Sequence, residues 1–365
     1  IKDICDLQNG RAFKPSDWGT AGLPIIRIQN LNDERAPFNY YGGKYNLAQE
    51  VDNGDLLFSW SGTPGTSFGA FLWNRGKGVL NQHIFKVIPK VEVDKTYLMY
   101  ALNGNISTII SKAHGGVGLQ HITKKELDEI EIQMVSISRQ KEIVEILEKI
   151  SLLIFLRKQQ IVKLDELVKA RFVEMFGDPA DNVNNLPASP MTAICQIIDG
   201  DRGKNYPKQE EFSDSGFCLF LNAKNVTAQG FSFENCTYIT EEKDALLRNG
   251  KLCRGDVVLT TRGTIGNLAF YDTSVPYENI RINSGMVILR MNKQVVSEIF
   301  FIEQFKMQLD SIKSRIASGS AQPQLPISTM NKIEMILPPI ELQNQFSAFV
   351  ERVDKQKQTV QQSLD

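Results

Sequence analysis

Two short turns, one in each half of the chain, combine glycine with hydroxyl and basic side chains. One covers residues 59–63, with the sequence Ser-Trp-Ser-Gly-Thr, and the other covers residues 260–264, Thr-Thr-Arg-Gly-Thr. Glycine lets a backbone approach a phosphate closely, while the guanidinium and hydroxyl groups beside it can hydrogen-bond to phosphates or base edges. Alternatively, these glycines only allow the chain to form a tight hairpin, and the turn binds nothing. The candidate nucleic-acid contacts are Ser61, Gly62, Thr63, Thr261, Arg262, Gly263 and Thr264.

Further polar side chains lie in loops that could serve the same chemistry. Amide and imidazole groups suit adenine or phosphate, and those in glycine-containing loops late in each half are Gln120, His121, Gln322 and Gln324. Basic groups suit phosphate, and those that follow the first predicted strand of each half are Arg11, Lys14, Arg202 and Lys204. Three further basic residues are weaker candidates for contacts with nucleic acid: Arg27, Lys224 and Arg281. Alternatively, all of these side chains face solvent in loops and contact no nucleic acid.

Motifs for catalysis and metal binding are missing from the sequence. It contains no phosphate loop of the G-x-x-x-x-G-K-[ST] type, no H-E-x-x-H and no methyltransferase tetrad. The three histidines lack the spacing of metal ligands, and the five cysteines form no C-x-x-C pair. We therefore expect no catalytic site, no metal and no cofactor in this chain. A nuclease whose catalytic carboxylates are scattered along the chain stays an open alternative, because a single sequence does not reveal such a site.

The composition is that of a globular protein with room for two domains. The 365 residues are 42% hydrophobic and 23% charged, and the formal net charge is −1. That balance argues against a protein that coats DNA by bulk charge, but it permits local basic contacts. No apolar run approaches the roughly 18–20 residues that span a bilayer. An odd number of unpaired cysteines predicts reduced thiols and a cytoplasmic protein.

An internal repeat with a period of about 200 residues is the strongest sequence signal. The matching segments keep their order, and they include residues 4–10 with 194–200, 54–58 with 255–259, 62–65 with 263–266, and 130–132 with 333–335. Gln120 aligns with Gln324 in the same series. The period is too long for a solenoid, so it indicates a duplicated domain with its connector. Two similar domains make a pseudo-twofold protein, which suits a target with two separated half-sites.

Each half is predicted to be a compact α+β domain. Short β-type runs separated by glycine and proline turns come first, then two helical stretches, then a closing strand at residues 129–135 or 332–337. The predicted boundaries are 1–137 for the first target-binding domain, 138–178 for a long central helix, 179–340 for the second domain and 341–365 for a second helix.

The central helix carries apolar residues in alternating steps of four and three, which predicts a coiled-coil seam. It is expected to end at Gly177, which a proline follows at position 179. The second helix repeats the seam over fewer heptads, and the two helices are predicted to pack antiparallel. The predicted seam residues are Ile143, Leu147, Ile150, Ile154, Ile161, Leu164 and Val168 in the first helix, with Phe346, Phe349 and Val353 in the second.

A duplicated α+β domain followed each time by a long helix resembles the specificity subunit of type I restriction–modification enzymes. Three local signals carry the resemblance: the Gly-Asp-aliphatic-aliphatic and Gly-Thr-x-Gly runs within 54–65 and 255–266, the loop 319–325 ahead of Leu-Pro-Pro at 337–339, and the segment 170–178 that closes the central helix. The sequence departs from the family pattern in its short second helix. It also has Gly-Val at 116–117 where the second half has Ser-Ala-Gln at 320–322.

The resemblance implies a non-catalytic subunit in which each domain reads one half of a bipartite double-stranded DNA sequence, while the helices set the unread spacer. It implies docking of two adenine-N6 methyltransferase subunits, which use S-adenosylmethionine, and of a restriction subunit, a motor–nuclease that uses ATP and Mg. Dimerisation through the short second helix stays open. The alternatives are a nuclease or methyltransferase-related enzyme, and a coiled-coil adaptor between proteins.

Overall fold

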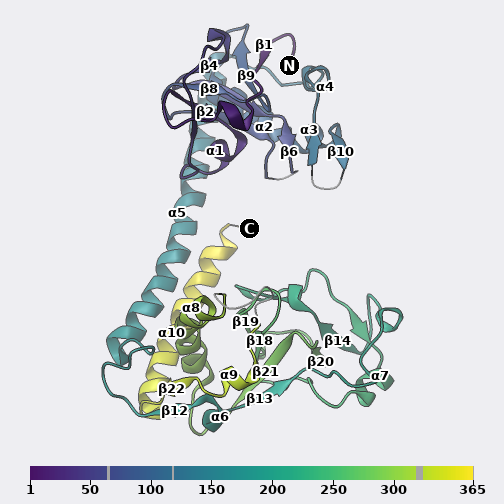
Figure 1. Cartoon of the computed structure of the whole chain (residues 1–365), viewed down its shortest axis with the longest axis vertical. Coiled ribbons are helices and arrows are strands. Elements are labelled where there is room, and N and C mark those ends of the chain that lie inside the picture. The colour runs from purple at the N-terminus through teal and green to yellow at the C-terminus, as the bar shows by residue number, and fades with distance from the viewer. Residues whose placement is uncertain (64–65, 117–118, 318–323, 365) are drawn as a thin grey trace. The chain divides into compact units, whose positions relative to one another are not determined.

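The protein folds into two compact units, Ile1–Ile154 and Phe155–Asp365. The computed structural model describes residues 1–63, 66–116, 119–317 and 324–364, and Figure 1 shows its helices and strands. Each unit has sheets and a hydrophobic core of its own. The mixed helix and strand content confirms the predicted α+β class.

The first unit is built around an antiparallel sheet with the strand order β1-β9-β5-β7. The central strand β5 is buried on both faces: Leu56 and Phe58 enter a core with Leu98, whereas Leu57 enters a second core with Ile26. The strands of this sheet are β1 (Cys5–Asn9), β5 (Asp55–Ser59), β7 (Gly69–Trp73) and β9 (Ile84–Pro89).

Two further sheets and several helices complete this unit. The sheet β3-β2-β8-β4 comprises β2 (Leu23–Ile26), β3 (Asn39–Tyr41), β4 (Glu50–Val51) and β8 (Gly78–Leu80). The sheet β10-β11-β6 comprises β6 (Ser61–Gly62), β10 (His114–Gly116) and β11 (Leu119–His121). The helices are α1 (Ile28–Asn32), α2 (Lys95–Gly104), α3 (Ile106–Ser111) and α4 (Lys124–Asp128).

The second unit repeats the main sheet in the order β13-β21-β18-β19. Its central strand β18 shows the same division, because Val257 and Leu259 enter one core and Val258 enters another. The strands are β13 (Cys195–Asp199), β18 (Val257–Thr260), β19 (Leu268–Phe270) and β21 (Met286–Met291). The predicted duplication of the fold is therefore confirmed at the level of strand order.

The smaller sheets of the second unit also match those of the first. β14 (Cys218–Leu221) pairs antiparallel with β17 (Tyr238–Ile239) and parallel with β20 (Ile280–Ile282), as β2 pairs with β3 and β8. The other elements are β15 (Val226–Thr227), β16 (Gly230–Phe231), β12 (Ala188–Pro190), β22 (Glu334–Ile336), α6 (Met191–Ile194), α7 (Glu241–Leu246), α8 (Glu298–Ala317), α9 (Ile327–Met330) and α10 (Ile340–Gln362).

The shared Gly-Asp sequence has a structural role in both units. The Oδ2 atom of Asp55 accepts a hydrogen bond from the Asp52 amide (2.9 Å) and lies 2.7 Å from the Lys86 ammonium. Asp256 likewise accepts from the Cys253 amide (2.7 Å) and lies 2.7 Å from the Arg290 guanidinium. The aspartate thus closes the turn before the central strand and pairs with a cation on the neighbouring strand, which accounts for its presence in both copies.

The closing strand is confirmed in one copy only. β22 forms within the predicted segment 332–337 and pairs with β12. Residues 129–136, all of which are described, form no strand, so that part of the prediction is wrong. A strand needs a partner for its backbone hydrogen bonds, and β12 has no counterpart among the residues before β1.

Helix α5 (Ile137–Phe176) begins one residue before the predicted start and ends at the predicted glycine, Gly177, whose φ is +81°. Within the second unit its last turns pack antiparallel on α10. The Phe172 and Phe346 rings lie 5.3 Å apart, and eleven residues further along α10 the Lys357 ammonium lies 2.6 Å from the Asp165 carboxylate. The predicted antiparallel pairing of the two helices is confirmed here.

The predicted seam is only partly buried. Val168, Phe346 and Val353 lie in the core, and Leu164 and Phe349 pack against its edge. Ile143, Leu147 and Ile161 are half-buried. Ile150 and Ile154 are exposed, so their pairing within this chain was predicted wrongly. The heptad pattern continues along α5 beyond the turns that α10 covers, and Val350 rather than Phe349 is the buried residue of that turn of α10.

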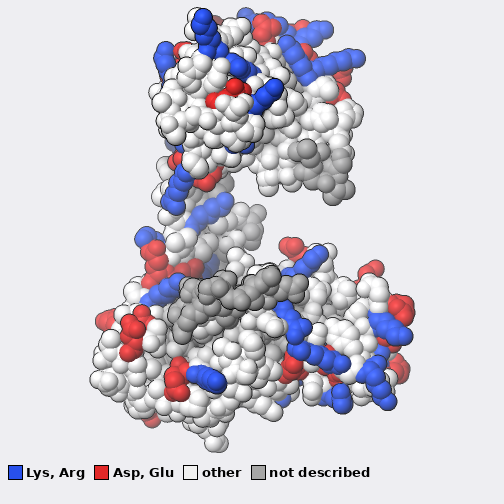
Figure 2. All heavy atoms as spheres, viewed as in Figure 1, with Lys and Arg blue, Asp and Glu red and all other residues white. Residues whose placement is uncertain are grey.

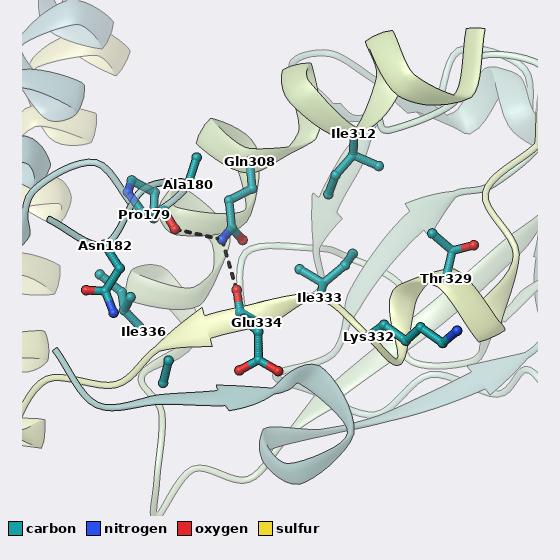
Figure 3. A pocket seen from close by; sticks show the side chains of 11 residues that line it. Pro179, Ala180, Asn182, Gln308, Ile312, Thr329, Lys332, Ile333, Glu334 and Ile336 are labelled. Atoms are coloured by element: carbon teal, nitrogen blue, oxygen red, sulfur yellow. Dashed lines mark hydrogen bonds between the residues drawn. The ribbon is translucent and has the colours of Figure 1, made fainter. Parts of the chain in front are cut away.

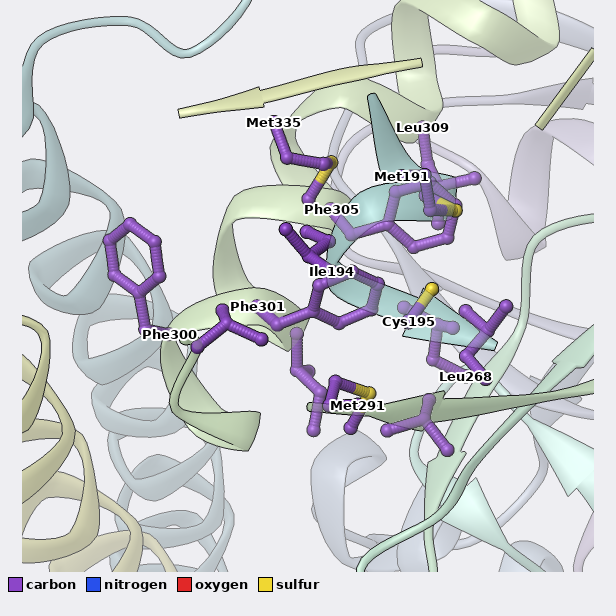
Figure 4. Close-up of a cluster of buried hydrophobic side chains, with 14 of the residues drawn as sticks. Met191, Ile194, Cys195, Leu268, Met291, Phe300, Phe301, Phe305, Leu309 and Met335 are labelled. Carbon is purple, nitrogen blue, oxygen red and sulfur yellow. The ribbon is translucent and has the colours of Figure 1, made fainter. Parts of the chain in front are cut away.

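The largest core of the second unit joins the end of α5 to the sheet. Phe300, Phe301 and Phe305 of α8 are fully buried between α5, α10 and the strands. Figure 4 shows part of this core, in which the side chains of Met191, Ile194 and Met291 approach α8 from the opposite side to α5.

Candidate nucleic-acid interface

The turn that follows β18 is held by two neighbouring segments of the second unit, one at Gly285 and one at residues 324–325. The backbone amides of Thr261 and Arg262 both donate to the Gly285 carbonyl (2.9 and 3.2 Å), and the Leu325 amide donates to the Thr261 carbonyl (3.0 Å). Arg262 and Gln324 are cross-strand neighbours in an antiparallel bridge. The side chains of both residues are exposed. The structure therefore brings together two predicted contacts that are 62 positions apart in sequence.

A hollow of about 310 Å³ adjoins this pair. Its lining includes Asp199, Arg202, Arg262, Gln324 and Ile327. The Arg202 guanidinium donates to the Asp199 carboxylate (3.2 Å) and to the Ser284 carbonyl (3.1 Å), so it is held against the turn 283–285. Among the described residues Arg262 has no such partner. The hollow thus combines one neutralised cation with one free guanidinium.

The other predicted residues of this turn serve mainly to shape it. Gly263 has a φ of +70°, a conformation that favours glycine. Thr261 is buried, and its hydroxyl donates to the Gly285 carbonyl (3.0 Å). The Thr264 carbonyl accepts from the Thr260 hydroxyl, while the Thr264 side chain is exposed. Gln322 lies outside the described residues.

The equivalent site of the first unit has the same backbone arrangement and different side chains. The Ile122 amide donates to the Trp60 carbonyl (3.0 Å), and β11 places His121 opposite Ser61 and Gln120 opposite Gly62. His121 therefore occupies the place of Gln324, one position away from the Gln120–Gln324 alignment that the sequence indicated. His121 is exposed, whereas Ser61 is buried. The Thr63 carbonyl accepts from the amides of residues 66 and 67.

An aromatic residue that sequence reasoning did not select lies at this first site. The Trp60 ring stacks on Phe85 at 5.5 Å and lies 5.4 Å from the His83 ring. Its indole N–H donates to the Asn9 amide oxygen (3.4 Å). Burial lowers the pKa of His83, which favours the neutral imidazole. The turn sequence contained Trp60, but nothing local indicated that β9 would bring His83 and Phe85 beside it.

The basic residues around the two sites differ in how they are held. The Arg11 guanidinium donates to the Tyr41 hydroxyl (2.8 Å) and stacks on the Tyr41 ring at 4.7 Å. Arg27 stacks on Trp18 at 5.0 Å. Three further predicted basic residues are exposed and, like Arg262, have no side-chain partner among the described residues: Lys14, Lys204 and Lys224. Figure 2 shows basic and acidic groups interspersed on the visible face of both units.

Arg281 is buried, which removes it from the candidate DNA contacts. Its guanidinium pairs with the Asp244 carboxylate and donates to the carbonyls of Asp244 (2.8 Å), Leu247 (3.1 Å) and Asn249 (2.8 Å). The Lys251 ammonium lies 2.6 Å from the other carboxylate oxygen of Asp244. All three guanidinium nitrogens of Arg281 thus donate hydrogen bonds inside the unit, so the prediction for this residue is wrong.

Replacing Arg281 with Met is expected to destabilise the second unit by about 3–5 kcal/mol, because it leaves the buried Asp244 carboxylate without its main partner. Burial alone raises the pKa of Asp244, but the hydrogen bonds and charges of Lys251 and Arg281 outweigh it, so this pKa is lowered. The pair therefore stabilises the fold above the unfolded-state pKa of aspartate, about 3.9, and loses this contribution as the pH falls through the folded-state value.

Urea unfolding followed by circular dichroism at neutral pH checks this expectation. Lys251→Met is the matched control, because it removes a more exposed partner of the same carboxylate and should cost clearly less. Equal stability of the Arg281→Met variant and the unaltered protein would contradict the assignment of this ion pair.

A second hollow, of about 520 Å³, lies away from these turns near the end of α5. Figure 3 shows that Gln308 reaches across it, and the Nε2 atom of this residue donates to the carbonyls of Pro179 (3.2 Å) and Glu334 (3.0 Å). Gln308 therefore ties the segment after α5 to β22. The lining of this hollow is mixed: it includes the apolar side chains of Ile312, Ile333 and Ile336 and the polar ones of Asn182, Thr329, Lys332 and Glu334.

Metal binding and membrane insertion find no support in the part of the chain that the structure describes. It contains no group of three or more His, Cys, Asp or Glu side chains that could hold a metal ion. None of its described helices combines the length and hydrophobicity needed to cross a membrane. The five cysteines are free thiols.

The fold and the duplicated turn sites define a protein with two homologous α+β domains and long connecting helices. The family model for the type I restriction modification DNA specificity domain matches residues 1–166 and 190–365. The chain belongs to this family.

Individual relatives agree with this assignment. The chain is 24% identical to the type I restriction enzyme MjaVIII specificity subunit of Methanocaldococcus jannaschii, in an alignment covering 83% of this chain and 73% of the relative. It is 21% identical to the type I restriction enzyme EcoBI specificity subunit of Escherichia coli, with coverages of 97% and 78%.

Solved structures show the same fold. The S subunit of a type I restriction-modification system from M. genitalium has 17% identity and a TM-score of 0.52, with coverages of 100% of this chain and 90% of that one. A chain from a study of complex assembly and conformational transition of the type I R-M system has 13% identity and a TM-score of 0.59, with coverages of 100% and 91%.

Proposed function

We propose that each of the two units reads one half of a bipartite duplex DNA sequence. Sequence-specific DNA recognition in a type I restriction–modification system is the function that family membership indicates. The observation that carries the bipartite reading is the duplicated turn site, which keeps its backbone hydrogen bonds but has different facing side chains, Ser61 and His121 in the first unit and Arg262 and Gln324 in the second. Two domains that share the backbone of this site but differ in its side chains suit two different base sequences.

The proposal assigns no catalysis to this chain. Its relatives are named specificity subunits. Methyl transfer is assigned to adenine-N6 methyltransferase partners that use S-adenosylmethionine, and DNA cleavage to a restriction partner that uses ATP and Mg. The chain itself needs no cofactor in this scheme, and its place of action is the cytoplasm. The uninterrupted helix α5 is proposed to fix the length of the unread spacer.

The middle of α5 is the proposed docking surface for the methyltransferase subunits. We call this segment, residues 146–156, the apolar belt; its exposed apolar residues are Ile146, Ile150, Leu152, Leu153, Ile154, Phe155 and Leu156. A helix that is apolar on all sides is normally buried by neighbouring helices. The seam of α10 is already covered within the chain, so the apolar belt is a better candidate for contacts with other subunits than α10 is. Self-association through the belt is a competing outcome that the test below distinguishes.

Selection from a random duplex pool with the purified chain and its methyltransferase tests the function. We expect enrichment of two short fixed sequences separated by a constant number of unselected base pairs. Enrichment of one contiguous motif would contradict the bipartite reading, and no enrichment at all would favour a protein-binding adaptor. Methyl transfer by the chain alone would favour an enzyme.

A further inference from the structure

The facing residues of the two turn sites occupy equivalent places, so they can be compared one to one. In each unit the residue before the glycine faces a residue of the late loop across an antiparallel bridge: Ser61 faces His121, and Arg262 faces Gln324. The adjoining backbone hydrogen bond measures 3.0 Å in both units. These four side chains are therefore the equivalent positions of the two sites.

Arg262 and Gln324 are placed to contact neighbouring base pairs. Directly opposed residues of antiparallel segments have Cβ atoms about 4.5–5.5 Å apart, and successive base pairs are about 3.4 Å apart along a strand. Among the described residues neither side chain has a hydrogen-bonding partner, and both are exposed. Arginine presents two donors that match the O6 and N7 atoms of guanine, and glutamine presents a donor and an acceptor that match the N6 and N7 atoms of adenine.

The hollow beside Arg262 carries charged groups of both signs. The hollow beside Arg262 includes the Asp199 carboxylate, which pairs with Arg202. A phosphate that entered the hollow would meet this carboxylate as well as the guanidinium of Arg262. Arg202 already pairs with that carboxylate, so Arg262 is the unpaired charge among the residues that line the hollow. The backbone hydrogen bonds of the turn place it beside the hollow, where its guanidinium can reach a base edge.

The first unit has no equivalent guanine-reading group. Ser61 is buried, and its hydroxyl cannot offer the fork of two donors that a guanidinium provides. The imidazole of His121 has a different shape and also lacks this fork. The two sites thus differ most clearly in their ability to select guanine.

We infer that the half-site read by the second unit contains a G·C pair directly beside an A·T pair, read by Arg262 and Gln324 respectively, whereas the equivalent position of the first unit does not select guanine. This inference rests on the proposed function and specifies which bases the duplicated site selects.

Duplex selection with two variants tests the inference, with the methyltransferase partner present throughout. Arg262→Gln should reduce the preference for guanine at one position by about 10- to 100-fold and leave the other half-site unchanged. Gln324→Glu should change the preference at the adjacent position from adenine to cytosine, because a carboxylate accepts from the cytosine N4 amino group. Lys306→Gln is the control, since it removes an exposed cation of the same unit that is not a candidate DNA contact and should leave every base preference unchanged.

The possible outcomes separate the inference from the function beneath it. A uniform loss of affinity for all sequences in Arg262→Gln would identify a phosphate contact and overturn the inference, as would unchanged preferences. Changes confined to the other half-site would overturn it too. If the unaltered chain selects no bipartite sequence, the proposed function itself fails.

Discussion

Replacing Leu152, Leu153, Phe155 and Leu156 of the apolar belt with glutamine is expected to abolish binding of the methyltransferase subunits. These side chains are 52–59% exposed in the chain alone, so their removal costs the isolated protein little. In a complex, buried apolar anchors of this size each contribute about 2 kcal/mol or more, and four of them should weaken binding by well over 100-fold. Glutamine keeps a high helix propensity, which preserves α5.

Co-purification and sedimentation of the mixed subunits measure this effect, and circular dichroism of the isolated variant checks that it folds. Leu47→Gln is the matched control, because Leu47 is an exposed leucine of the first unit outside the apolar belt. Unchanged methyltransferase binding by the fourfold variant would contradict the docking proposal. If that variant instead turned a dimer of the isolated chain into a monomer, the apolar belt would be a self-association surface.

Replacing Phe172 with Ala is expected to destabilise the second unit by about 3–5 kcal/mol, the usual cost of deleting a buried ring. Phe172 is fully buried. Its ring centre lies 5.1 Å from that of Phe176, 5.4 Å from that of Phe300 and 5.3 Å from that of Phe346. One residue therefore joins α5 to both α8 and α10, and its loss leaves a cavity between three helices.

Urea unfolding with two optical signals localises this effect. The three tryptophans, Trp18, Trp60 and Trp73, all belong to the first unit. Their fluorescence should therefore change little in Phe172→Ala, whereas the circular dichroism transition should move to lower urea. Val173→Ala serves as the control because Val173 is the next residue of α5 and is 44% exposed. A variant as stable as the unaltered chain would show that this aromatic cluster does not hold the helices together.

The internal repeat made much of the fold predictable. The match between residues 54–58 and 255–259 predicts both central strands and the glycine turns after them. The structure confirms the same strand order in each unit. The paired helices were predictable in kind because heptads reveal an apolar stripe. Their extent was not, since a stripe does not show how far its partner reaches, and Ile150 and Ile154 are exposed for that reason.

The site residues that were predicted wrongly from the sequence are those whose position depends on long-range contacts. Arg281 lies in the interior because it pairs with Asp244, 37 positions away, and the sequence around Arg281 does not reveal this pairing. The equivalence of His121 with Gln324 depends on cross-strand pairing, which a loop of different length in each copy had concealed. Trp60 entered the site through its contacts with a strand that lies about 25 residues further along the chain.

Mapping every methylated adenine in the DNA of cells that express this chain together with its methyltransferase tests the two-unit reading most directly. The expected result is a set of sites that share two short invariant blocks, divided by a gap of one fixed length. Methylation at a single continuous sequence, at gaps of varying length, or at the same sites when the chain is omitted would contradict it.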